Sequence, residues 1–411
     1  MPMFFLYNIL IIIAKSALSL VALFSPKIKL FIEGRKTVFT TLREKIKSGD
    51  KTIWFHAASL GEYEQGLPVM EKVRAMHPGH KIVLTFFSPS GYEVRKNTTT
   101  ADVIVYLPMD TLANAKKFLA IVKPEKVFFI KYEFWPNYLN ELKKTDAKVY
   151  LISVFFRKDQ VFFKWYGGFY RNALKTFRHF FVQYESSKAL LQSIGYNNVT
   201  ISGDTRYDRV SEILERDNKL PFIEEFKNDK VTVVFGSSWP KDEAIFTDFI
   251  NASTDAKFII APHTIGADHI NDIKSSLTKK TMLFSEKEGK NLAEYDVLII
   301  DTIGILTKIY SYADVAYVGG GFGTSGLHNI LEPAAFGVPI IIGPNHNKFP
   351  EAVALVNMGG CIAVSNKEEM NDALSSLVYN DDYRWEKGHI AGTFVGMNRG
   401  AVNIILKNIE D

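Results

Sequence analysis

Hydrophobic residues along the 411-residue chain form two consecutive series of short apolar runs, separated by stretches of helical periodicity. Short continuous apolar runs between helical stretches are typical of parallel strands that helices cover on both faces. The first series comprises residues 52–57, 81–87, 103–107, 126–130, 148–153, 180–183 and 199–203. The second comprises residues 231–235, 257–261, 282–285, 297–301, 315–319, 339–343 and 362–365. We therefore predict an α/β protein with two doubly wound, Rossmann-like domains.

The boundary between these domains is predicted from a polar and charged stretch at residues 204–229. We expect, in chain order, an N-terminal segment at 1–48, a first domain at 49–208, a linker at 209–229 and a second domain at 230–411. The end of the chain has a helical pattern, and its last helices are candidates to pack back on the first domain. When two such domains face each other, ligands bind in the cleft at the carboxyl ends of the strands.

Residues 3–24 form the one membrane-like segment, and their number is near the roughly 20 residues that span a bilayer. No positive charge precedes the segment, which argues against a cleaved signal peptide. Lys15 lies in its middle, where it can snorkel from a shallow helix. The stretch from residue 27 to 51 is rich in Lys and Arg, which attract anionic lipid headgroups and favour a cytoplasmic location. We predict membrane association, either spanning or interfacial; the alternative is a helix that packs on its own domain.

The composition indicates a folded protein in a reducing compartment. Hydrophobic residues make up 47% of the chain and charged residues 23%, with a net charge of +4, which argues against disorder. The single cysteine, Cys361, lies in an apolar run and excludes a disulfide framework. No zinc-ligand spacing occurs, and we expect neither a metal, a cofactor nor a nucleic acid as a partner.

The most informative stretch for chemistry extends from residue 314 to residue 351. Three consecutive glycines at 319–321 end an apolar run and permit close approach of the backbone to a ligand. We expect His328, Asn329 and Glu332 within about one turn of each other at the start of a helix, whose N–H groups favour an anion. A carboxylate there suits a pair of sugar hydroxyls. The stretch predicts a site for a phosphate joined to a ribose, and it lacks the G-x-G-x-x-G pattern of nicotinamide-binding folds.

In the first domain, a loop with Ser59 and Gly61 follows the first predicted strand, and Glu62 comes next at the start of a helix. Two interpretations of Glu62 have equal support. It is either a carboxylate that interacts favourably with the helix dipole, or a general base at the carboxyl end of a parallel strand. Glycine directly before it allows a substrate to approach closely.

Glu133 occupies a similar position after the strand at 126–130, before Pro136, which can open a helix. Two carboxylates that end neighbouring strands can orient a sugar hydroxyl and help remove its proton. Taken alone, Glu133 is better explained as a capping acid beside Trp135 in the core. A third strand-to-helix turn carries Ser88, Ser90 and Gly91.

The second domain repeats this arrangement. Ser237 and Ser238 follow a strand, and their backbone amides and hydroxyls suit a phosphate or a carboxylate. His263 ends another strand, although a lone histidine there is more often structural. The sequence contains no D-x-D, the metal-diphosphate motif of many glycosyltransferases. Helix N-termini, His and Ser would then stabilise the charge on a departing nucleoside monophosphate.

Taken in order, these motifs resemble the Kdo transferases of lipid A biosynthesis, glycosyltransferase family 30, over nearly the whole chain. H-N-x-L-E-[PA]-A-A at residues 328–335 is the most specific motif. The others are G-R at 34–35, S-[VL]-G-E at 59–62, T-x-x-S-x-S/T-G at 85–91, E-[LF]-W-P-N at 133–137, G-D-[TS]-[RK]-[YF]-D at 203–208 and G-P…N-x-F at 343–349.

The resemblance implies a GT-B fold with an N-terminal membrane-anchoring helix, a CMP-Kdo donor and a lipid A precursor, lipid IVA, as acceptor. It implies an inverting, metal-independent transfer at the cytoplasmic face of the inner membrane. Glu62 would be the catalytic base and Glu133 would position the acceptor or Kdo. The implied acceptor-binding residues are Ser59, Gly61, Ser88, Ser90 and Gly91. The implied donor-binding residues are Arg206, Ser237, Ser238, His263, Gly320, His328, Asn329 and Glu332.

Three segments depart from the family pattern. Many members have P-R-H at residues 261–263, G-E-L at 304–306 and N-A-R-[LM]-S at 153–157, so this chain balances the donor's charge differently. The alternatives are a GT-B transferase for another nucleotide sugar and an enzyme like the UDP-sugar 2-epimerases, which would not need a membrane anchor. A catalytically inactive nucleotide-binding protein is the alternative that is not an enzyme.

Overall fold

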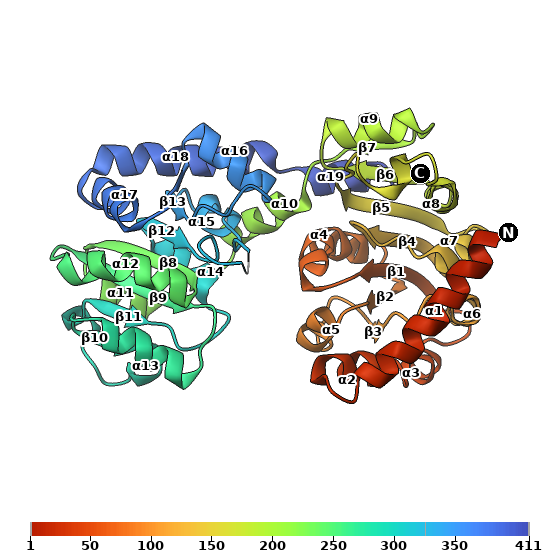
Figure 1. Ribbon diagram of the computed structural model, residues 1–411, viewed down its shortest axis with the longest axis horizontal. Helices are drawn as coiled ribbons and strands as arrows, with labels where there is room; N and C mark the ends of the chain where they lie inside the picture. Colours follow the sequence, from red (N-terminus) through yellow and green to blue (C-terminus); the bar gives the residue numbers. More distant parts are fainter. Residues whose placement is uncertain (1, 325, 410–411) are drawn as a thin grey trace. The chain divides into compact units, whose positions relative to one another are not determined.

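The computed structural model describes residues 2–324 and 326–409, and the chain forms two compact units (Figure 1). Unit 1 comprises Met1–Arg209 and Arg399–Asp411, and unit 2 comprises Val210–Asn398. Within the described residues, each unit contains one sheet of seven strands, all of them parallel. The predicted α/β class with two doubly wound domains is confirmed.

The sheet of unit 1 has the order β3-β2-β1-β4-β5-β6-β7, which reverses direction between β1 and β4. This reversal is the switch point at which doubly wound sheets bind ligands. The strands are β1 (Lys51–Ala57), β2 (His80–Phe86), β3 (Val103–Tyr106), β4 (Pro124–Ile130), β5 (Lys148–Val154), β6 (His179–Val182) and β7 (Val199–Ile201). The connecting helices are α4 (Leu60–Met76), α5 (Pro89–Arg95), α6 (Leu112–Val122), α7 (Pro136–Leu142), α8 (Gly168–Leu174) and α9 (Glu185–Ser193).

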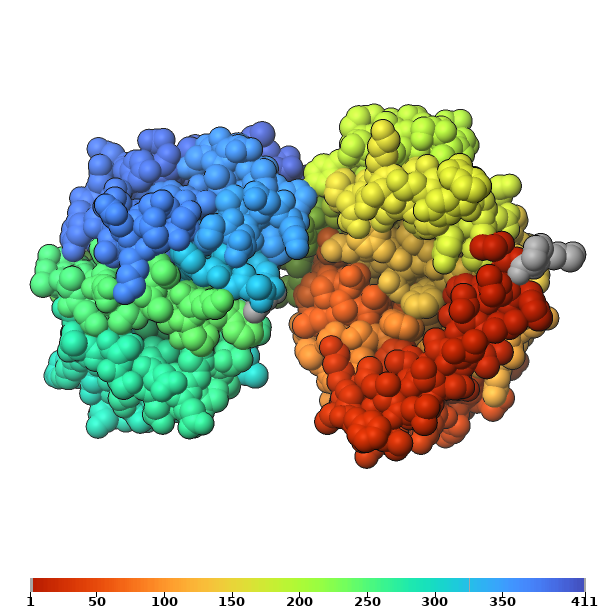
Figure 2. All heavy atoms as spheres, in the orientation of Figure 1, coloured from red at the N-terminus to blue at the C-terminus, as the bar shows by residue number. Residues whose placement is uncertain are grey.

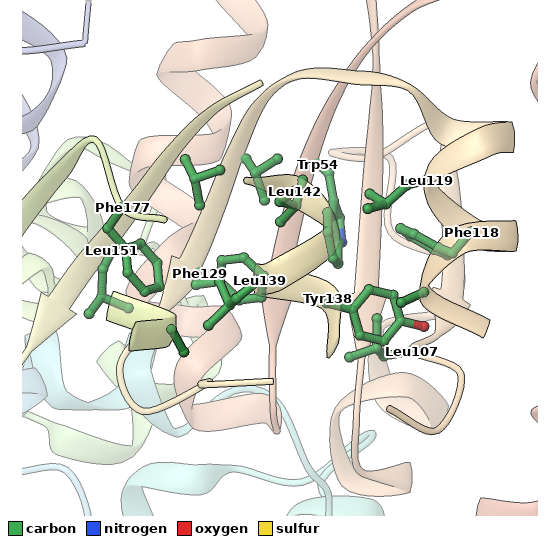
Figure 3. Close-up of a cluster of buried hydrophobic side chains, with 14 of the residues drawn as sticks. Trp54, Leu107, Phe118, Leu119, Phe129, Tyr138, Leu139, Leu142, Leu151 and Phe177 are labelled. Carbon is green, nitrogen blue, oxygen red and sulfur yellow. The ribbon is translucent and has the colours of Figure 1, made fainter. Parts of the chain in front are cut away.

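Both faces of this sheet carry a hydrophobic core, because successive strand residues point to opposite sides. On one face, the Trp54 ring packs against Phe118 of α6 and Tyr138 of α7, with ring centroids 4.8 and 5.8 Å away (Figure 3). On the other face, Phe55 stacks on Phe128 at 4.5 Å, in a cluster that includes residues of α4. Aromatic side chains on both sides of β1 thus fix the strand whose end carries the first site.

The sheet of unit 2 has the order β10-β11-β9-β8-β12-β13-β14. Its strands are β8 (Val231–Ser238), β9 (Ala256–Pro262), β10 (Thr281–Leu283), β11 (Val297–Ile299), β12 (Val315–Val318), β13 (Ile340–Ile342) and β14 (Cys361–Ala363). Its helices are α11 (Pro221–Lys227), α12 (Pro240–Ala252), α13 (Ala267–Ser276), α14 (Leu306–Ile309), α15 (Leu331–Ala335), α16 (Pro350–Met358), α17 (Lys367–Tyr379) and α18 (Asp381–Asn398). Phe235 of β8 stacks on Phe246 of α12 at 3.9 Å.

The stretch that we expected to be a linker, residues 209–229, instead contains ordered structure. It holds the end of α10 (Thr205–Ser211), a short 3₁₀ turn and α11. Ile223 and Phe226 of α11 are fully buried in a core cluster of unit 2. The many charged neighbours in the sequence conceal this apolar pair, because they lie on the outer side of a short helix.

The chain returns to unit 1 at its end. The helix α19 (Ala401–Lys407) packs on α4, and Val402 and Ile405 are buried in the same core cluster as Phe55. Asp208 accepts a hydrogen bond from the backbone N–H of Gly400 at 2.8 Å, immediately before α19. The C-terminal helix is therefore part of the hydrophobic cover of the first sheet.

The N-terminal segment forms α1 (Pro2–Val21), α2 (Pro26–Glu33) and α3 (Val38–Lys45). The helix α1 is long and apolar enough to cross a membrane by length and composition. It lies along unit 1 (Figure 2), where Phe4 contacts Phe169 with ring centroids 5.2 Å apart. Its other side is exposed and consists mostly of large apolar side chains. Arg35, after α2, donates hydrogen bonds to the carbonyl oxygens of Phe87 and Leu107, and so fixes this segment to the sheet.

We expect α19 to stabilise unit 1 through its buried face, which carries Ile405, and not through its exposed face, which carries Ile404. Ile405→Ala should lower the free energy of unfolding by about 2–5 kcal/mol, because the Ile405 side chain is fully buried and its removal leaves a cavity. The adjacent Ile404 is 38% exposed, so Ile404→Ala should cost about 1 kcal/mol or less. Urea unfolding of both variants measures this difference, and equal losses would contradict the packing of α19.

Candidate functional site

Glu62 lies in the first turn of α4, directly after the carboxyl end of β1. Its Oε2 atom accepts a hydrogen bond from the backbone N–H of Ser59 at 3.0 Å and another from the Ser59 hydroxyl, which forms a capping box. No described residue donates a hydrogen bond to its Oε1 atom. The side chain is half-buried. Both interpretations of Glu62 are therefore compatible: one oxygen caps the helix, and the other is available to a substrate hydroxyl.

Glu133 follows β4 and is held by two side chains. His56 Nε2 lies 3.0 Å from Glu133 Oε2, and Trp135 Nε1 donates to the same oxygen at 2.9 Å. His56 is itself fully buried in β1, and its Nδ1 lies 2.8 Å from the Thr85 hydroxyl of β2. Trp135 Nε1 also lies 3.0 Å from His56 Nε2, so the indole N–H is shared between the carboxylate and the imidazole. Three neighbouring strands thus contribute to the orientation of one carboxylate.

The loops after β1 and β2 lie together. The N–H groups of Phe87 and Ser88 donate to the carbonyl oxygens of Ala57 and Ala58 at 3.2 and 2.7 Å. A Cβ atom on Gly91 would come within 3.0 Å of the Ser59 backbone, so a side chain there would push the loops apart. The Ser88 hydroxyl accepts from the N–H of Ser90 and caps α5. The structure therefore brings Ser59, Ser88, Ser90 and Gly91 together near Glu62, while Gly61 is exposed.

Arg206 lies in unit 1, at the start of α10. Its guanidinium forms an ion pair with Asp204 at 2.7 Å, and Asp204 also accepts from Gln65 at 3.1 Å. Asp204 is almost fully buried, and the nearby Arg206 charge holds its pKa below the usual value even though burial opposes this shift. Arg206 thus stabilises the end of the first sheet, and its expected contact with a donor stays a prediction.

The three glycines that end β12 in unit 2 are required by packing. A Cβ atom on Gly319 would lie 2.2 Å from the Ser237 carbonyl oxygen, and one on Gly320 would lie 2.1 Å from that of Gly326. Gly320 also has a φ of +94°, which favours glycine. Its N–H donates to Asp242 at 3.0 Å and is not available to a phosphate. We expected the glycines to serve ligand approach; in the structure their first role is to let neighbouring loops touch.

Three aromatic side chains form a stack beside the glycines. The rings of Trp239 and His263 are stacked with centroids 4.4 Å apart, and His263 and His328 are 4.6 Å apart. Trp239 Nε1 donates a hydrogen bond to His328 Nε2 at 3.1 Å. Because that nitrogen accepts, His328 is neutral with its proton on Nδ1. The structure therefore joins His263 and His328, which are 65 positions apart in the sequence.

Burial lowers the pKa of His328, and the neighbouring His263 lowers it further. Both effects disfavour the imidazolium form, in agreement with the hydrogen bond from Trp239. A neutral His328 can donate from Nδ1 to a ligand oxygen. The exposed His263 ring adds a second polar group at the same edge of the sheet.

Glu332 is oriented by two hydrogen bonds. Thr307 Oγ1 donates to its Oε2 at 2.8 Å, and Asn329 Nδ2 donates to its Oε1 at 3.1 Å. Each carboxylate oxygen accepts more than one hydrogen bond, so a diol can bind as well. The helix α15 begins only at Leu331 and has five residues, so His328 and Asn329 lie in the loop before it. We expected His328 and Asn329 at the start of this helix, but they precede it, and the His328 N–H donates to the Gly319 carbonyl oxygen.

The two serines after β8 have different surroundings. Ser238 is fully buried, and its hydroxyl donates to Glu243 at 2.9 Å, so it supports α12 and does not present its hydroxyl to a ligand. Ser237 is half-buried and has a φ of +54°, a conformation that costs a non-glycine residue about 1 kcal/mol or more.

Lys131 and Ser153 also have positive φ at the ends of β4 and β5. Strained residues of this kind gather at functional sites.

Several supporting residues were missed by the sequence analysis. They are His56, Trp239, Asp242, Glu243, His269 and Thr307. The Asp242 carboxylate accepts hydrogen bonds from the Gly320 N–H and the Tyr317 hydroxyl. Glu243 Oε2 lies 2.8 Å from His269 Nε2. A polar residue inside an apolar strand, such as His56, was the one available signal, since burying it requires a partner. The others stand in ordinary helical or loop contexts.

A comparison with protein families matches residues 34–209 to the family of 3-deoxy-D-manno-octulosonic-acid transferases (kdotransferases). A 3-deoxy-D-manno-octulosonic acid transferase from Chlamydia trachomatis is 28% identical over 371 residues, which cover 86% of this chain and 84% of the relative. The enzyme from Aquifex aeolicus with the same name is 26% identical over 344 residues, 82% of this chain and 88% of the relative.

Among solved structures, UDP-GlcNAc 2-epimerase from Neisseria meningitidis matches with a TM-score of 0.63 and 16% identity, and covers 87% of this chain and 99% of its own. At this identity the likeness shows the fold alone. Two parallel doubly wound units of this kind constitute the GT-B fold, so the expected architecture is confirmed.

The lowered pKa of His328 predicts a pH dependence of stability in unit 2. The unfolded chain binds a proton near pH 6.5, whereas folded His328 does so only at lower pH. As pH falls below about 6.5, the unfolded state gains protons first, and stability should decrease. His328→Asn should show a flatter decrease between pH 7.5 and 5.5 in thermal unfolding. Parallel curves for wild type and His328→Asn would contradict a neutral, half-buried His328.

Proposed function

We propose that this chain is a Kdo transferase, a kind of glycosyltransferase, and that it transfers Kdo from CMP-Kdo to the lipid A precursor lipid IVA. The observation that carries the proposal is the geometry of Glu62. Its carboxylate follows the first parallel strand, one oxygen is fixed by Ser59, and the other accepts no hydrogen bond from the described residues. A fixed carboxylate with one available oxygen is what a general base requires.

In the proposed reaction, a sugar hydroxyl of the acceptor gives its proton to Glu62. The hydroxyl oxygen attacks the anomeric carbon of Kdo from the face opposite CMP, and the bond between that carbon and the phosphate oxygen breaks. The configuration is thereby inverted and CMP leaves with the bonding electrons. Glu133, oriented by His56 and Trp135, would position the acceptor or Kdo.

We assign donor binding to unit 2. Glu332 and Asn329 suit the ribose hydroxyls, since Glu332 is already oriented by Thr307. The neutral His328 and the exposed His263 would donate hydrogen bonds to the departing phosphate. The half-buried Ser237 and the loop at Gly320 complete this set. Ser238 would act indirectly, through Glu243.

The acceptor is a lipid, so the proposed reaction takes place at a membrane. The apolar α1 supports attachment to the cytoplasmic face of the inner membrane, and the basic stretch from residue 27 to 51 supports contact with anionic lipids. An enzyme like the UDP-sugar 2-epimerases, whose fold this chain shares, acts on a soluble nucleotide sugar and would have no use for such a helix.

We expect transfer to be independent of divalent metal ions, because the sequence has no D-x-D and the leaving group is a monophosphate. Purified protein given lipid IVA and CMP-Kdo, generated in situ, should form Kdo-lipid IVA at the same rate with and without EDTA. Mass spectrometry of the lipid product measures this. Loss of the product with EDTA would exclude the metal-independent mechanism, and epimerisation of UDP-GlcNAc would favour the alternative enzyme.

Glu62→Gln separates the two roles of Glu62. Glutamine still accepts a hydrogen bond from the Ser59 N–H, so the helix cap is kept, but it cannot take a proton. We expect kcat to fall by about 100-fold or more, with CMP affinity unchanged in calorimetry. Glu71→Gln, the same change further along α4, should leave transfer close to the wild-type rate. An active Glu62→Gln enzyme would remove Glu62 from the role of base.

A further inference from the structure

The exposed side of α1 is mostly apolar, with Lys15, Ser16 and Ser19 as its polar residues. Phe5, Ile13 and Leu20 are 71%, 58% and 67% exposed. The other exposed apolar residues of α1 and the turn after it are Met3, Leu6, Ile9, Leu10, Ile12, Val21, Leu23 and Phe24. A continuous apolar face of this kind is unfavourable in water and marks a surface that binds something.

The opposite side of α1 is half-buried, and its first two turns contact unit 1 through Phe4, Tyr7 and Asn8. The half-buried positions are Phe4, Tyr7, Asn8, Ile11, Ala14 and Leu18, and they recur every three to four residues on one face. The Tyr7 hydroxyl donates to Asp110 at 2.7 Å, and Asn8 accepts from Asn137 at 3.1 Å. The exposed and half-buried positions therefore lie on different sides of the helix.

These contacts conflict with a helix that crosses a bilayer. A free transmembrane helix meets lipid on every side, so Tyr7 and Asn8 would have to leave polar partners and enter hydrocarbon. Asp110 would lose the Tyr7 donor although its carboxyl group is buried. Burial already raises the pKa of Asp110 to about 6, and the hydrogen bonds from Tyr7, Asn137 and Tyr138 oppose this rise. The contacts fit a helix that stays on unit 1 and exposes one face only.

The charges around the apolar face favour an anionic lipid surface over a second copy of the chain. No Asp or Glu occurs between residues 2 and 32, whereas Lys15, Lys27 and Lys29 are exposed. If the apolar faces of two copies of the chain packed together, these lysines would lie near the lysines of the other copy. No carboxylate in this segment would compensate their positive charge. Trp165 and Tyr166 are also exposed, by 91% and 59%, next to the helix that carries Phe169. Aromatic residues of this type concentrate at the membrane–water interface.

We propose that α1 is an interfacial helix, which lies in the headgroup plane of an anionic membrane and keeps its inner face on unit 1. Its outer apolar face enters the lipid, and Lys15, Lys27 and Lys29 contact anionic headgroups. The inference rests on the membrane location proposed above but does not require transferase activity.

The same contacts tie the lipid-bound helix to the first site. Asp110, which receives the Tyr7 hydroxyl, also accepts the N–H groups of Asn137 and Tyr138 at 3.1 Å each. These N–H groups open α7, the helix that directly follows the loop with Glu133 and Trp135. A membrane-bound α1 therefore holds the Glu133 loop in a fixed relation to the lipid surface, which is where a lipid acceptor is presented.

A depth profile distinguishes an interfacial α1 from a spanning one. In the full-length chain with Cys361→Ala, single cysteines replace Phe5, Ile9, Ile13 or Leu20 and carry a fluorophore. All four side chains are exposed, so the label does not disturb the packed face. The protein is bound to vesicles of phosphatidylglycerol and phosphatidylcholine that contain lipids spin-labelled near the headgroup or deep in the acyl chain. A label at Met397, exposed on α18, is the control.

We expect the shallow quencher to act more strongly than the deep one at all four positions, with no maximum along the helix, and neither quencher to act at Met397. Lys27→Gln with Lys29→Gln should weaken binding by about fivefold per charge removed. Stronger deep quenching at Ile9 and Ile13 than at Phe5 and Leu20 would show a spanning helix and overturn the proposal. Absence of quenching at all four positions would also overturn the proposal, whether α1 binds no lipid or is covered by a second copy of the chain. An inactive protein with the shallow profile would contradict the proposed function and leave this inference intact.

Discussion

Parallel sheets impose the main constraint on this protein, because both of their faces must be shielded from water. Each strand therefore carries apolar side chains on two sides, and helices must cover both layers. In unit 1 this requirement extends to the ends of the chain, since α19 supplies part of the cover over Phe55 and Phe128. The same arrangement directs every strand-to-helix loop of a unit to one edge of its sheet, and the candidate site residues lie there.

At that edge, the polar groups of the site are held by a layer of buried polar residues beneath them. His56 and Trp135 orient Glu133, Thr307 orients Glu332, and Trp239 fixes the tautomer of His328. These supports come from different strands and loops, so they exist only when the whole unit is folded. Their function is preorganisation: a carboxylate or imidazole that is already aligned loses less freedom when a substrate binds.

The local structure around the candidate site was predicted well where it depends on residues close together in the sequence. Glu62 follows an apolar strand and begins a helix, and the capping box with Ser59 depends on residues three positions apart. The prediction was weaker for residues 319–332, because the loop conformation depends on distant groups. The Gly320 N–H is taken by Asp242, and α15 starts later than expected because the His328 N–H bonds back to Gly319. Ser238, adjacent to Ser237 in the sequence, is fully buried, and its hydroxyl donates to Glu243.

The sequence by itself determined the two parallel sheets and the positions of the loops that carry Glu62, Glu133, His263 and His328, because apolar periodicity and strand ends are local properties of the chain. It also determined that α1 is apolar. Only the tertiary structure decided which face of α1 is covered, since Asp110, Asn137 and Phe169 lie more than 100 positions away in the sequence. Hydrogen bonds and ring contacts between residues so far apart leave no periodic trace, and they appear only when the chain has folded.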